Sequence, residues 1–463
     1  MINMDTDKKL KEVHAFIDKQ FLVHLKKTQE FLRIRSITGE KHGLMEAAGW
    51  IKQYIGAAGG QSELVGEKEA PIVFGKFDSG KPKTVLTYGM YDVHPVSNEA
   101  WSSPPFAAKI RVLPEIGHSI IARGACNSKG PLAGLLNTLY SIKQLDEIPV
   151  NLILTIEGEE ESGSQSLEAF YLQNKELLRA DAGFEPFWAE YGTDVDRPTL
   201  NLGTKGIITL ELICSGGEWG GPTDAPVHSS VSAWLASPTW RLIKALGTLV
   251  GDEEEIKIEA FYNDVALPSK EDEELLCNLA GEFKEEKILN MIGARRFKYK
   301  LHGVDLLRKY IFSPTLSINL MTQPEGEIIP PQARAKLTIR LVPNMDVAKI
   351  IQIIRNHLKD QGYGDIEVLA LNGYPWSRVS LKEDVVQSMI ETYNYHGCKP
   401  QVQPMLASAT PYYLFSQVLG IPYTSGGLGR AGKSHSRDEY ASVEGLKLLE
   451  KSIATFLYFF ARK

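Results

Sequence analysis

Short apolar runs bounded by turn residues alternate with segments of helical spacing along the first part of the chain. Residues 84–89 (TVLTYG) and 150–156 (VNLILTI) have the length and composition of buried strands. Residues 8–33 and the segment between the two strands carry apolar residues at helical spacing, namely Leu10, Val13, Ile17 and Phe21, and then Leu132, Leu135, Leu136 and Leu139. The order strand, helix, strand predicts an α/β fold with a mixed, largely parallel sheet flanked by helices.

A different pattern begins in the middle of the chain, where alternating strands and helices of an α+β type follow a glycine-rich segment. Its predicted strands have the sequences IITLELI, TLSINL, AKLTIRLV and IEVLAL, and a helix is predicted from the cap Asp346 to the stop Gly362. The closing segment returns to long helices. We therefore expect a catalytic domain of residues 1–205 and 374–463, interrupted by an inserted α+β domain of residues 206–373.

Composition and charge narrow the class of protein. A chain of 463 residues with 43% hydrophobic and 23% charged residues is expected to form two globular domains. The net charge of −6, with Lys and Arg spread along the chain, predicts no nucleic-acid partner. No stretch approaches the roughly 18 uncharged apolar residues of a membrane-spanning helix, so no membrane partner is expected. The four scattered cysteines and the charged amino terminus, which lacks the apolar core of a secretion signal, predict reduced thiols in a cytoplasmic protein.

Polar and acidic turns follow the predicted strands. Asp92 follows the first strand in GMYDVHPV, and the segment EGEEESGS directly follows the second. Ligands of open α/β sheets bind at the carboxyl ends of the strands. Four carboxylates within five residues, 157–161, repel one another unless a cation, a shared proton or solvent compensates them. A solvated acidic loop is the alternative interpretation, and His435 in the late loop GLGRAGKSHSRDEY is by itself more typical of a structural histidine.

These segments together resemble a known family. In chain order GMYDVHPV, ARGACNSKGP, EGEEESGS, DAPVHSS, IRLVPN and GKSHSRDEY are similar to the motifs of the zinc metallopeptidase family of aminoacylase, acetylornithine deacetylase and carnosine dipeptidase. The resemblance extends from about residue 10 to the end of the chain. It implies a phosphorylase/hydrolase-like catalytic domain, an inserted lid domain that forms a homodimer, and two zinc ions that share a bridging aspartate and activate a water molecule.

The resemblance also implies roles for residues of the catalytic domain. Asp92 matches the aspartate that orients the first histidine ligand, and Glu160 matches the general base. Glu161 and His435 match ligands of the second metal, and Glu185 matches the carboxylate ligand of the first.

The same resemblance implies roles for a second carboxylate and for residues of the inserted domain. Glu190 is an alternative to Glu185 as the carboxylate ligand. His228 matches the lid histidine that polarises the scissile carbonyl in the partner subunit's active site. Arg340 resembles the arginine that binds the substrate carboxylate, and Asn319 is a further candidate for substrate binding.

The chain departs from the family at the metal site itself. Met90 stands where the family has its first histidine ligand, Asn127 where it has the bridging aspartate, and Ser128 where it has the next acidic residue. A thioether suits soft Cu(I) rather than zinc, and a neutral amide cannot replace an anionic bridge. We therefore expect no dinuclear zinc centre. At most one divalent metal, zinc or manganese, is expected at Glu161 and His435, with Asn127 as a weak third ligand and Glu185 as a further candidate, and binding of no metal stays open.

Three functions are compatible with this pattern. The first is a hydrolase with at most one metal that acts on a small amide, such as an N-acyl amino acid, a dipeptide or a related metabolite, with Glu160 as base and His228 at the oxyanion. The second is a metal-independent enzyme with different acyl or amide chemistry, in which Cys126 and His94 form a Cys–His pair, although an ordinary small residue is the alternative for Cys126. The third is a catalytically inactive homologue that binds a small molecule.

Overall fold

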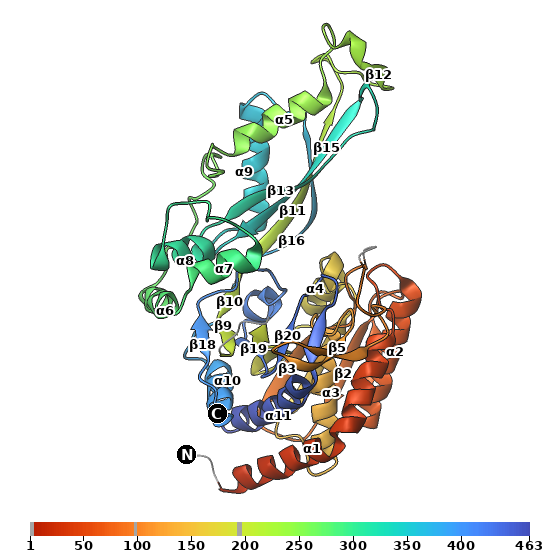
Figure 1. Cartoon of the computed structure of the whole chain (residues 1–463), viewed down its shortest axis with the longest axis vertical. Helices are drawn as coiled ribbons and strands as arrows, with labels where there is room; N and C mark the ends of the chain where they lie inside the picture. Colours follow the sequence, from red (N-terminus) through yellow and green to blue (C-terminus); the bar gives the residue numbers. More distant parts are fainter. Residues whose placement is uncertain (1–3, 97–99, 192–196) are drawn as a thin grey trace. The chain divides into compact units, whose positions relative to one another are not determined.

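The structure is a computed structural model and describes residues 4–96, 100–191 and 197–463 (Figure 1). The chain divides into two compact units. Unit 1 comprises Met1–Leu202, Val379–Val402 and Leu414–Lys463, and unit 2 comprises Gly203–Arg378 and Gln403–Tyr413. Unit 2 therefore takes in residues 203–205, 374–378 and 403–413, which the sequence had placed with the catalytic domain.

Unit 1 is built around a six-stranded mixed sheet in the order β1-β2-β6-β3-β7-β19. The four strands β6, β3, β7 and β19 run parallel, whereas β1 and β2 are antiparallel to their neighbours. The predicted largely parallel sheet is thus confirmed. The strands are β1 (Gln61–Val65), β2 (Ile72–Phe77), β3 (Thr84–Met90), β6 (Asn151–Glu157), β7 (Ala182–Pro186) and β19 (Tyr423–Gly426).

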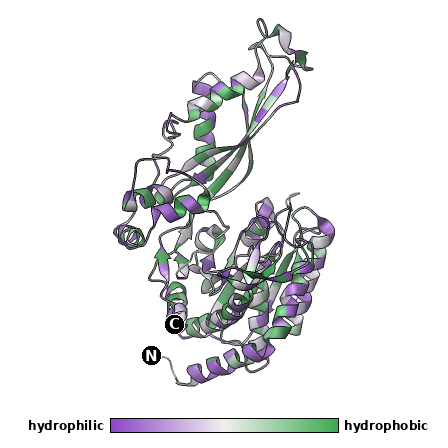
Figure 2. Ribbon diagram, viewed as in Figure 1, coloured by the Kyte–Doolittle hydropathy of each residue, from purple (hydrophilic) through white to green (hydrophobic). Residues whose placement is uncertain are grey.

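Helices cover this sheet, as the apolar runs predicted. Helix α2 packs on β1 and β2, α3 packs on β3 and β7, and α1 and α11 pack against α3 and against each other. The central strands are mostly hydrophobic, whereas α1 and α2 mix hydrophobic and hydrophilic residues (Figure 2). The helices of unit 1 are α1 (Met4–Arg33), α2 (Lys41–Ala57), α3 (Lys129–Lys143), α4 (Gln165–Gln173), α10 (Asp384–Tyr395) and α11 (Val443–Phe460).

A second sheet of unit 1, in the order β4-β5-β21-β20-β8, was not predicted from the sequence. It consists of β4 (Lys109–Leu113), β5 (Gly117–Ile121), β21 (Tyr440–Ser442), β20 (Arg430–Gly432) and β8 (Glu190–Tyr191). The pairing of β21 with β5 joins two segments that are more than 300 residues apart in the chain. This pairing places the loop between β20 and β21, which carries His435, beside the loop between β5 and α3, which carries Asn127. A short pair, β9 (Thr199–Asn201) with β18 (Gln401–Gln403), completes the strands that begin in unit 1.

Unit 2 contains an antiparallel sheet in the order β13-β15-β11-β16. Residues of β15 alternate between buried and half-buried, so that one face of the sheet packs against helix α5 and forms the core. Its elements are β10 (Gly203–Thr204), β11 (Gly206–Ser215), β12 (Val227–His228), α5 (Pro238–Leu249), α6 (Lys270–Ala280), α7 (Glu285–Ile292), α8 (Gly303–Phe312), β13 (Thr315–Thr322), β14 (Ile328–Ile329), β15 (Gln332–Leu341), α9 (Val347–Asp360), β16 (Glu367–Tyr374) and β17 (Ser377–Arg378).

The ends of α9 follow the sequence signals. The Asp346 side chain accepts a hydrogen bond from the backbone N–H of Lys349, which satisfies a free donor at the start of the helix. Gly362 has a φ of +82° just after the helix, in the left-handed region where glycine is favoured.

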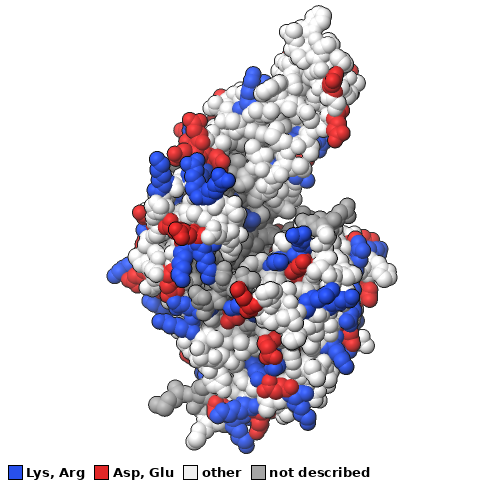
Figure 3. Space-filling view, viewed as in Figure 1, with Lys and Arg blue, Asp and Glu red and all other residues white. Residues whose placement is uncertain are grey.

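Charged side chains of both signs are interspersed on the face of the molecule shown in Figure 3. None of the helices in the described part of the chain is long and apolar enough to cross a membrane.

Candidate functional site

The acidic turns of the sequence meet at one edge of the main sheet of unit 1. Strands β6, β3 and β7 are parallel neighbours, so their carboxyl ends lie at the same edge. Asp92 follows β3 by two residues, Glu160 and Glu161 lie in a short 3₁₀ turn just after β6, and Glu185 lies near the end of β7. These four carboxylates therefore come from three adjacent strands.

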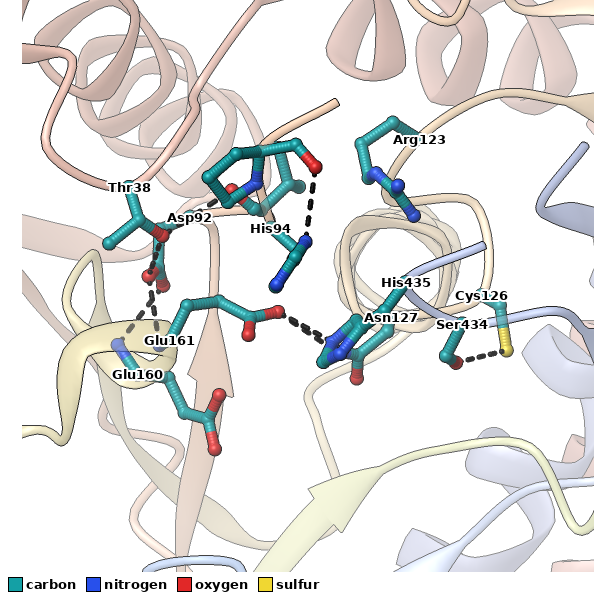
Figure 4. A network of polar contacts seen from close by, with 12 residues as sticks. Thr38, Asp92, His94, Arg123, Cys126, Asn127, Glu160, Glu161, Ser434 and His435 are labelled. Carbon is teal, nitrogen blue, oxygen red and sulfur yellow. Dashed lines mark hydrogen bonds and ion pairs between the residues drawn. The ribbon is translucent and has the colours of Figure 1, made fainter. Parts of the chain in front are cut away.

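Asp92 holds the acidic turn in place. Its fully buried carboxylate accepts hydrogen bonds from the Thr38 hydroxyl at 2.9 Å and from the backbone N–H groups of Glu160 and Glu161 at 3.2 and 3.1 Å (Figure 4). Burial raises the pKa of Asp92 to about 7, although these hydrogen bonds oppose the rise. With Met90 in place of a histidine, Asp92 orients the backbone of the turn.

Asn127, Glu161 and His435 converge on one point. His435 Nε2 lies 2.9 Å from Glu161 Oε1 and 3.0 Å from Asn127 Nδ2, and Asn127 Nδ2 lies 3.2 Å from Glu161 Oε1 (Figure 4). The hydrogen bond to Glu161 is the main cause that raises the pKa of His435. One Nε2 atom cannot donate its hydrogen to Glu161 and also accept a hydrogen bond from Asn127. A single hydrogen on Nε2 therefore cannot satisfy the hydrogen bonding of all three side chains.

This trio fits one cation. Ligand atoms of a tetrahedral zinc ion, with bonds of about 2.0–2.1 Å, lie about 3.3 Å apart, close to the three separations above. A half-turn of the Asn127 amide would present Oδ1 instead of Nδ2, so that an amide oxygen, a carboxylate and an imidazole face the same point. Among the described residues no three His, Cys, Asp or Glu side chains are grouped to hold a metal, since the third member of this trio is an asparagine.

The neighbouring half of this site does not fit a second cation. Met90 is 3% exposed and pairs in register with Glu157, whose Oε1 accepts hydrogen bonds from the hydroxyls of Tyr88 and Ser164, each at 2.8 Å. Glu157 Oε2 is buried and accepts no hydrogen bond from the described residues. Burial, and next to it the charge of Asp92, raises the pKa of Glu157 to about 8, so this carboxyl keeps its proton at neutral pH.

Glu160 has the environment of a general base or acid. Burial, and then the charges of Glu161 and Asp92, raises its pKa well above the usual range of a glutamate. Glu185 also contributes to this rise, which places it near Glu160, and it accepts a hydrogen bond from the Ser425 hydroxyl at 3.4 Å. Glu190, the alternative ligand, instead lies on β8 in register with Arg430 of β20.

Sequence reasoning missed the residue that positions Asn127. The buried carboxylate of Glu439 accepts hydrogen bonds from the backbone N–H groups of Cys126 and Asn127 at 2.9 and 2.8 Å. It also forms a buried ion pair with Arg123 at 2.8 Å. The signal in the sequence is that Glu439 belongs to the segment GKSHSRDEY, four residues after His435.

Cys126 and His94 do not contact each other. Cys126 is buried, its sulfur lies 3.4 Å from the Ser434 hydroxyl, and burial raises the pKa of the thiol well above its usual value. A nucleophilic cysteine needs the opposite shift. His94 instead stacks on His435, with ring centroids 4.7 Å apart and ring planes inclined by 17°. This contact was also missed, because His94 had been weighed only as a partner of Cys126.

The three remaining candidates lie in unit 2. His228 ends β12, is well exposed, and its Nδ1 contacts the hydroxyl and the backbone N–H of Ser230. Arg340 lies on β15, on the face opposite the buried residues, where Asn319 of the edge strand β13 donates a hydrogen bond to Thr338. Asn319 sits at an irregularity of the ladder between β13 and β15.

Comparison with known proteins identifies the family of this site. The model of the family described as Peptidase family M20/M25/M40 matches residues 86–461. The chain is 28% identical over 340 residues to the Cys-Gly metallodipeptidase DUG1 of Saccharomyces cerevisiae, covering 70% of this chain and 66% of that protein. It is 27% identical over 301 residues to the β-Ala-His dipeptidase of Homo sapiens, covering 63% of this chain and 56% of that protein. The matches thus span about three fifths of the length of these curated relatives.

Solved structures agree over nearly the whole chain. The M20 family metallo-carboxypeptidase Sso-CP2 from Sulfolobus solfataricus is 30% identical, with a TM-score of 0.86, and the match covers 95% of this chain and 99% of that one. Human carnosine dipeptidase 1 has a TM-score of 0.81 at 20% identity, covering 98% and 99% of the two chains, and supports the fold alone.

Proposed function

Because this chain belongs to peptidase family M20/M25/M40, we propose that it hydrolyses a small amide, most simply a dipeptide or an N-acyl amino acid, with at most one divalent metal. The observation that carries the proposal is the convergence of Asn127, Glu161 and His435 next to Glu160. The relatives named for cleaving Cys-Gly and β-Ala-His support a dipeptide as the substrate class.

We assign the metal, zinc or manganese, to Glu161 and His435, with the Asn127 amide oxygen as a third and weaker ligand. Glu185, whose charge contributes to the raised pKa of Glu160, is the remaining candidate ligand. A bound cation would supply Lewis acidity and lower the pKa of a water molecule. Two cations are not proposed, since Met90 and Asn127 provide neither the imidazole nor the anionic bridge that a pair requires.

The protein's own groups handle the proton and the substrate. Glu160, in its carboxylate form, takes the proton from the attacking water and returns it to the leaving amine. Asp92 keeps Glu160 and Glu161 in position through their backbone N–H groups. In unit 2, His228 is proposed to polarise the scissile carbonyl, and Arg340 and Asn319 are proposed to bind the substrate carboxylate.

Unit 2 is proposed to be the lid and to form a homodimer. Its edge strand β13 exposes several apolar side chains, and an unpaired strand edge of this kind is a template for pairing: Ile318, Leu320 and Met321 are 48%, 47% and 44% exposed. Sedimentation of the purified protein tests the dimer, and a monomer at assay concentrations would contradict it. The four cysteines are all free, in keeping with the proposed cytoplasmic location, which cell fractionation tests.

Metal analysis combined with one substitution tests the proposed function. Protein purified without chelator is expected to contain about one equivalent of zinc or manganese and to hydrolyse members of a panel of dipeptides and acyl amino acids. Glu160→Gln is expected to lower kcat by about 10²–10⁴-fold with unchanged metal content. Glu159→Gln, in the same turn, is the matched control. Two equivalents per chain, or full activity of Glu160→Gln, would contradict the proposal.

A further inference from the structure

His435 is held in place by few contacts, although the proposed metal site depends on its orientation. Its side chain is 45% exposed and lies on a loop where Lys433, His435 and Asp438 all have positive φ. Packing alone therefore does not fix the imidazole. Its edge contacts Glu161 and Asn127, which orient one nitrogen but leave the ring free to tilt about that point.

His94 covers the face of this ring. The two imidazoles are 4.7 Å apart between centroids and nearly parallel, at 17°. Figure 4 shows the two histidines beside each other. Stacked rings of this kind are worth about 2- to 10-fold in an equilibrium constant.

The backbone that carries His94 is well anchored. Val93 is fully buried, its N–H donates to the Ser36 carbonyl at 2.9 Å, and its own carbonyl accepts from the Thr38 N–H at 3.1 Å. The His94 ring is fixed in turn, because its Nδ1–H donates to the Pro95 carbonyl at 3.0 Å. The side chain of His94 is exposed, but its ring nitrogen and the backbone beside it are held by hydrogen bonds, whereas His435 lies on a loop with three non-glycine residues of positive φ.

We propose that His94 is a positioning residue of the metal site, which holds the His435 imidazole toward Glu161 and Asn127 by stacking on its face. This inference deepens the proposed function, on which its metal-binding consequence rests. The pocket lacks an imidazole at position 90, and an imidazole four residues later supports the one that remains. The role requires a flat ring at position 94 and does not require its nitrogen lone pair.

Two substitutions separate the ring from the lone pair. In titrations of Zn²⁺ against a chromophoric chelator, His94→Ala is expected to weaken zinc binding about 2- to 10-fold, and His94→Phe is expected to restore it. The exposed His118 on β5 gives the control His118→Ala, with no change expected. Equal losses in His94→Ala and His94→Phe, or no loss in His94→Ala, would overturn the proposal.

A second measurement needs no metal. With selectively labelled histidines, the Hε1–Cε1 signal of His435, assigned through His435→Gln, reports how well its ring is held in the metal-free protein. The signal is expected to move toward the free-histidine position in His94→Ala and to stay in place in His94→Phe. If the wild type binds no zinc but these shifts occur, the proposed function fails and the positioning role stands. An unmoved signal in His94→Ala overturns the role itself.

Discussion

The two halves of the acidic site neutralise their carboxylates in different ways. Glu161 faces the His435 imidazole at 2.9 Å, and this contact raises the pKa of His435. Glu157, paired in register with Met90, has one oxygen without a hydrogen bond from the described residues and a pKa of about 8. In the first half an imidazolium or a cation supplies the positive charge, whereas in the second half a proton bound to the carboxyl does. Only the first half combines an imidazole with a carboxylate, the ligand types that suit zinc.

The largest effect is expected from removing Glu439, which holds the backbone of Asn127 in the half of the site that contains His435. Glu439→Ala leaves Arg123 buried without its partner, and breaking a buried ion pair in this way costs about 3–5 kcal/mol of unfolding free energy. It also removes the acceptor for the Asn127 N–H, so zinc affinity is expected to fall as well. Urea unfolding measures the stability. The exposed pair of Glu444 with Lys447 provides the control Glu444→Ala, with a loss below about 1 kcal/mol. Equal losses in both variants would contradict the role given to Glu439.

The proton on Glu157 in the second half is expected to make the stability of the protein depend on pH. The folded protein keeps the Glu157 proton up to a pKa of about 8, whereas an ordinary glutamate loses it near 4.5. Between these values the folded state binds more protons, so stability falls as pH rises, by up to about 1.4 kcal/mol for each pH unit. Glu157→Gln removes this contribution. Unfolding titrations from pH 5 to 8 should give a flatter profile for this variant, and identical slopes would contradict the assignment.

Restoring the family's ligands at positions 90 and 127 tests the comparison directly. Met90→His with Asn127→Asp restores an imidazole and an anionic bridge, so metal content is expected to rise from about one to about two equivalents per chain. Elemental analysis after dialysis against zinc measures it, with each single substitution as a control. If the double variant binds no more zinc than the wild type, these positions do not correspond to the ligand positions of the family.

Local signals made much of this fold predictable. A short stretch of sequence is enough to recognise the apolar runs of β3 and β6 and the acidic turns that follow them. The same holds for the cap Asp346 and the stop Gly362 of α9. The resemblance to a family then supplied candidates for the pocket that no single segment could give.

What the sequence did not reveal depends on contacts between distant segments. The second sheet of unit 1 uses strands of two or three residues, β8 and β20, which are too short to show a period. Glu439 binds backbone N–H groups more than 300 residues earlier in the chain. The stacking of His94 on His435 spans a similar separation, and no pattern within either segment marks it.

The smallest effect, and the cleanest comparison, is expected from Met90→Leu. Leucine keeps the volume and the burial of this side chain but has no sulfur, so the loss of stability should stay below about 1.5 kcal/mol. Zinc affinity and turnover should be unchanged, because Met90 is not a ligand in the proposed site. Calorimetric zinc titration and dipeptide hydrolysis measure both. A fall in zinc affinity without a comparable loss of stability would mean that the thioether binds the cation, and the division between a cation-binding half and a protonated half would then fail.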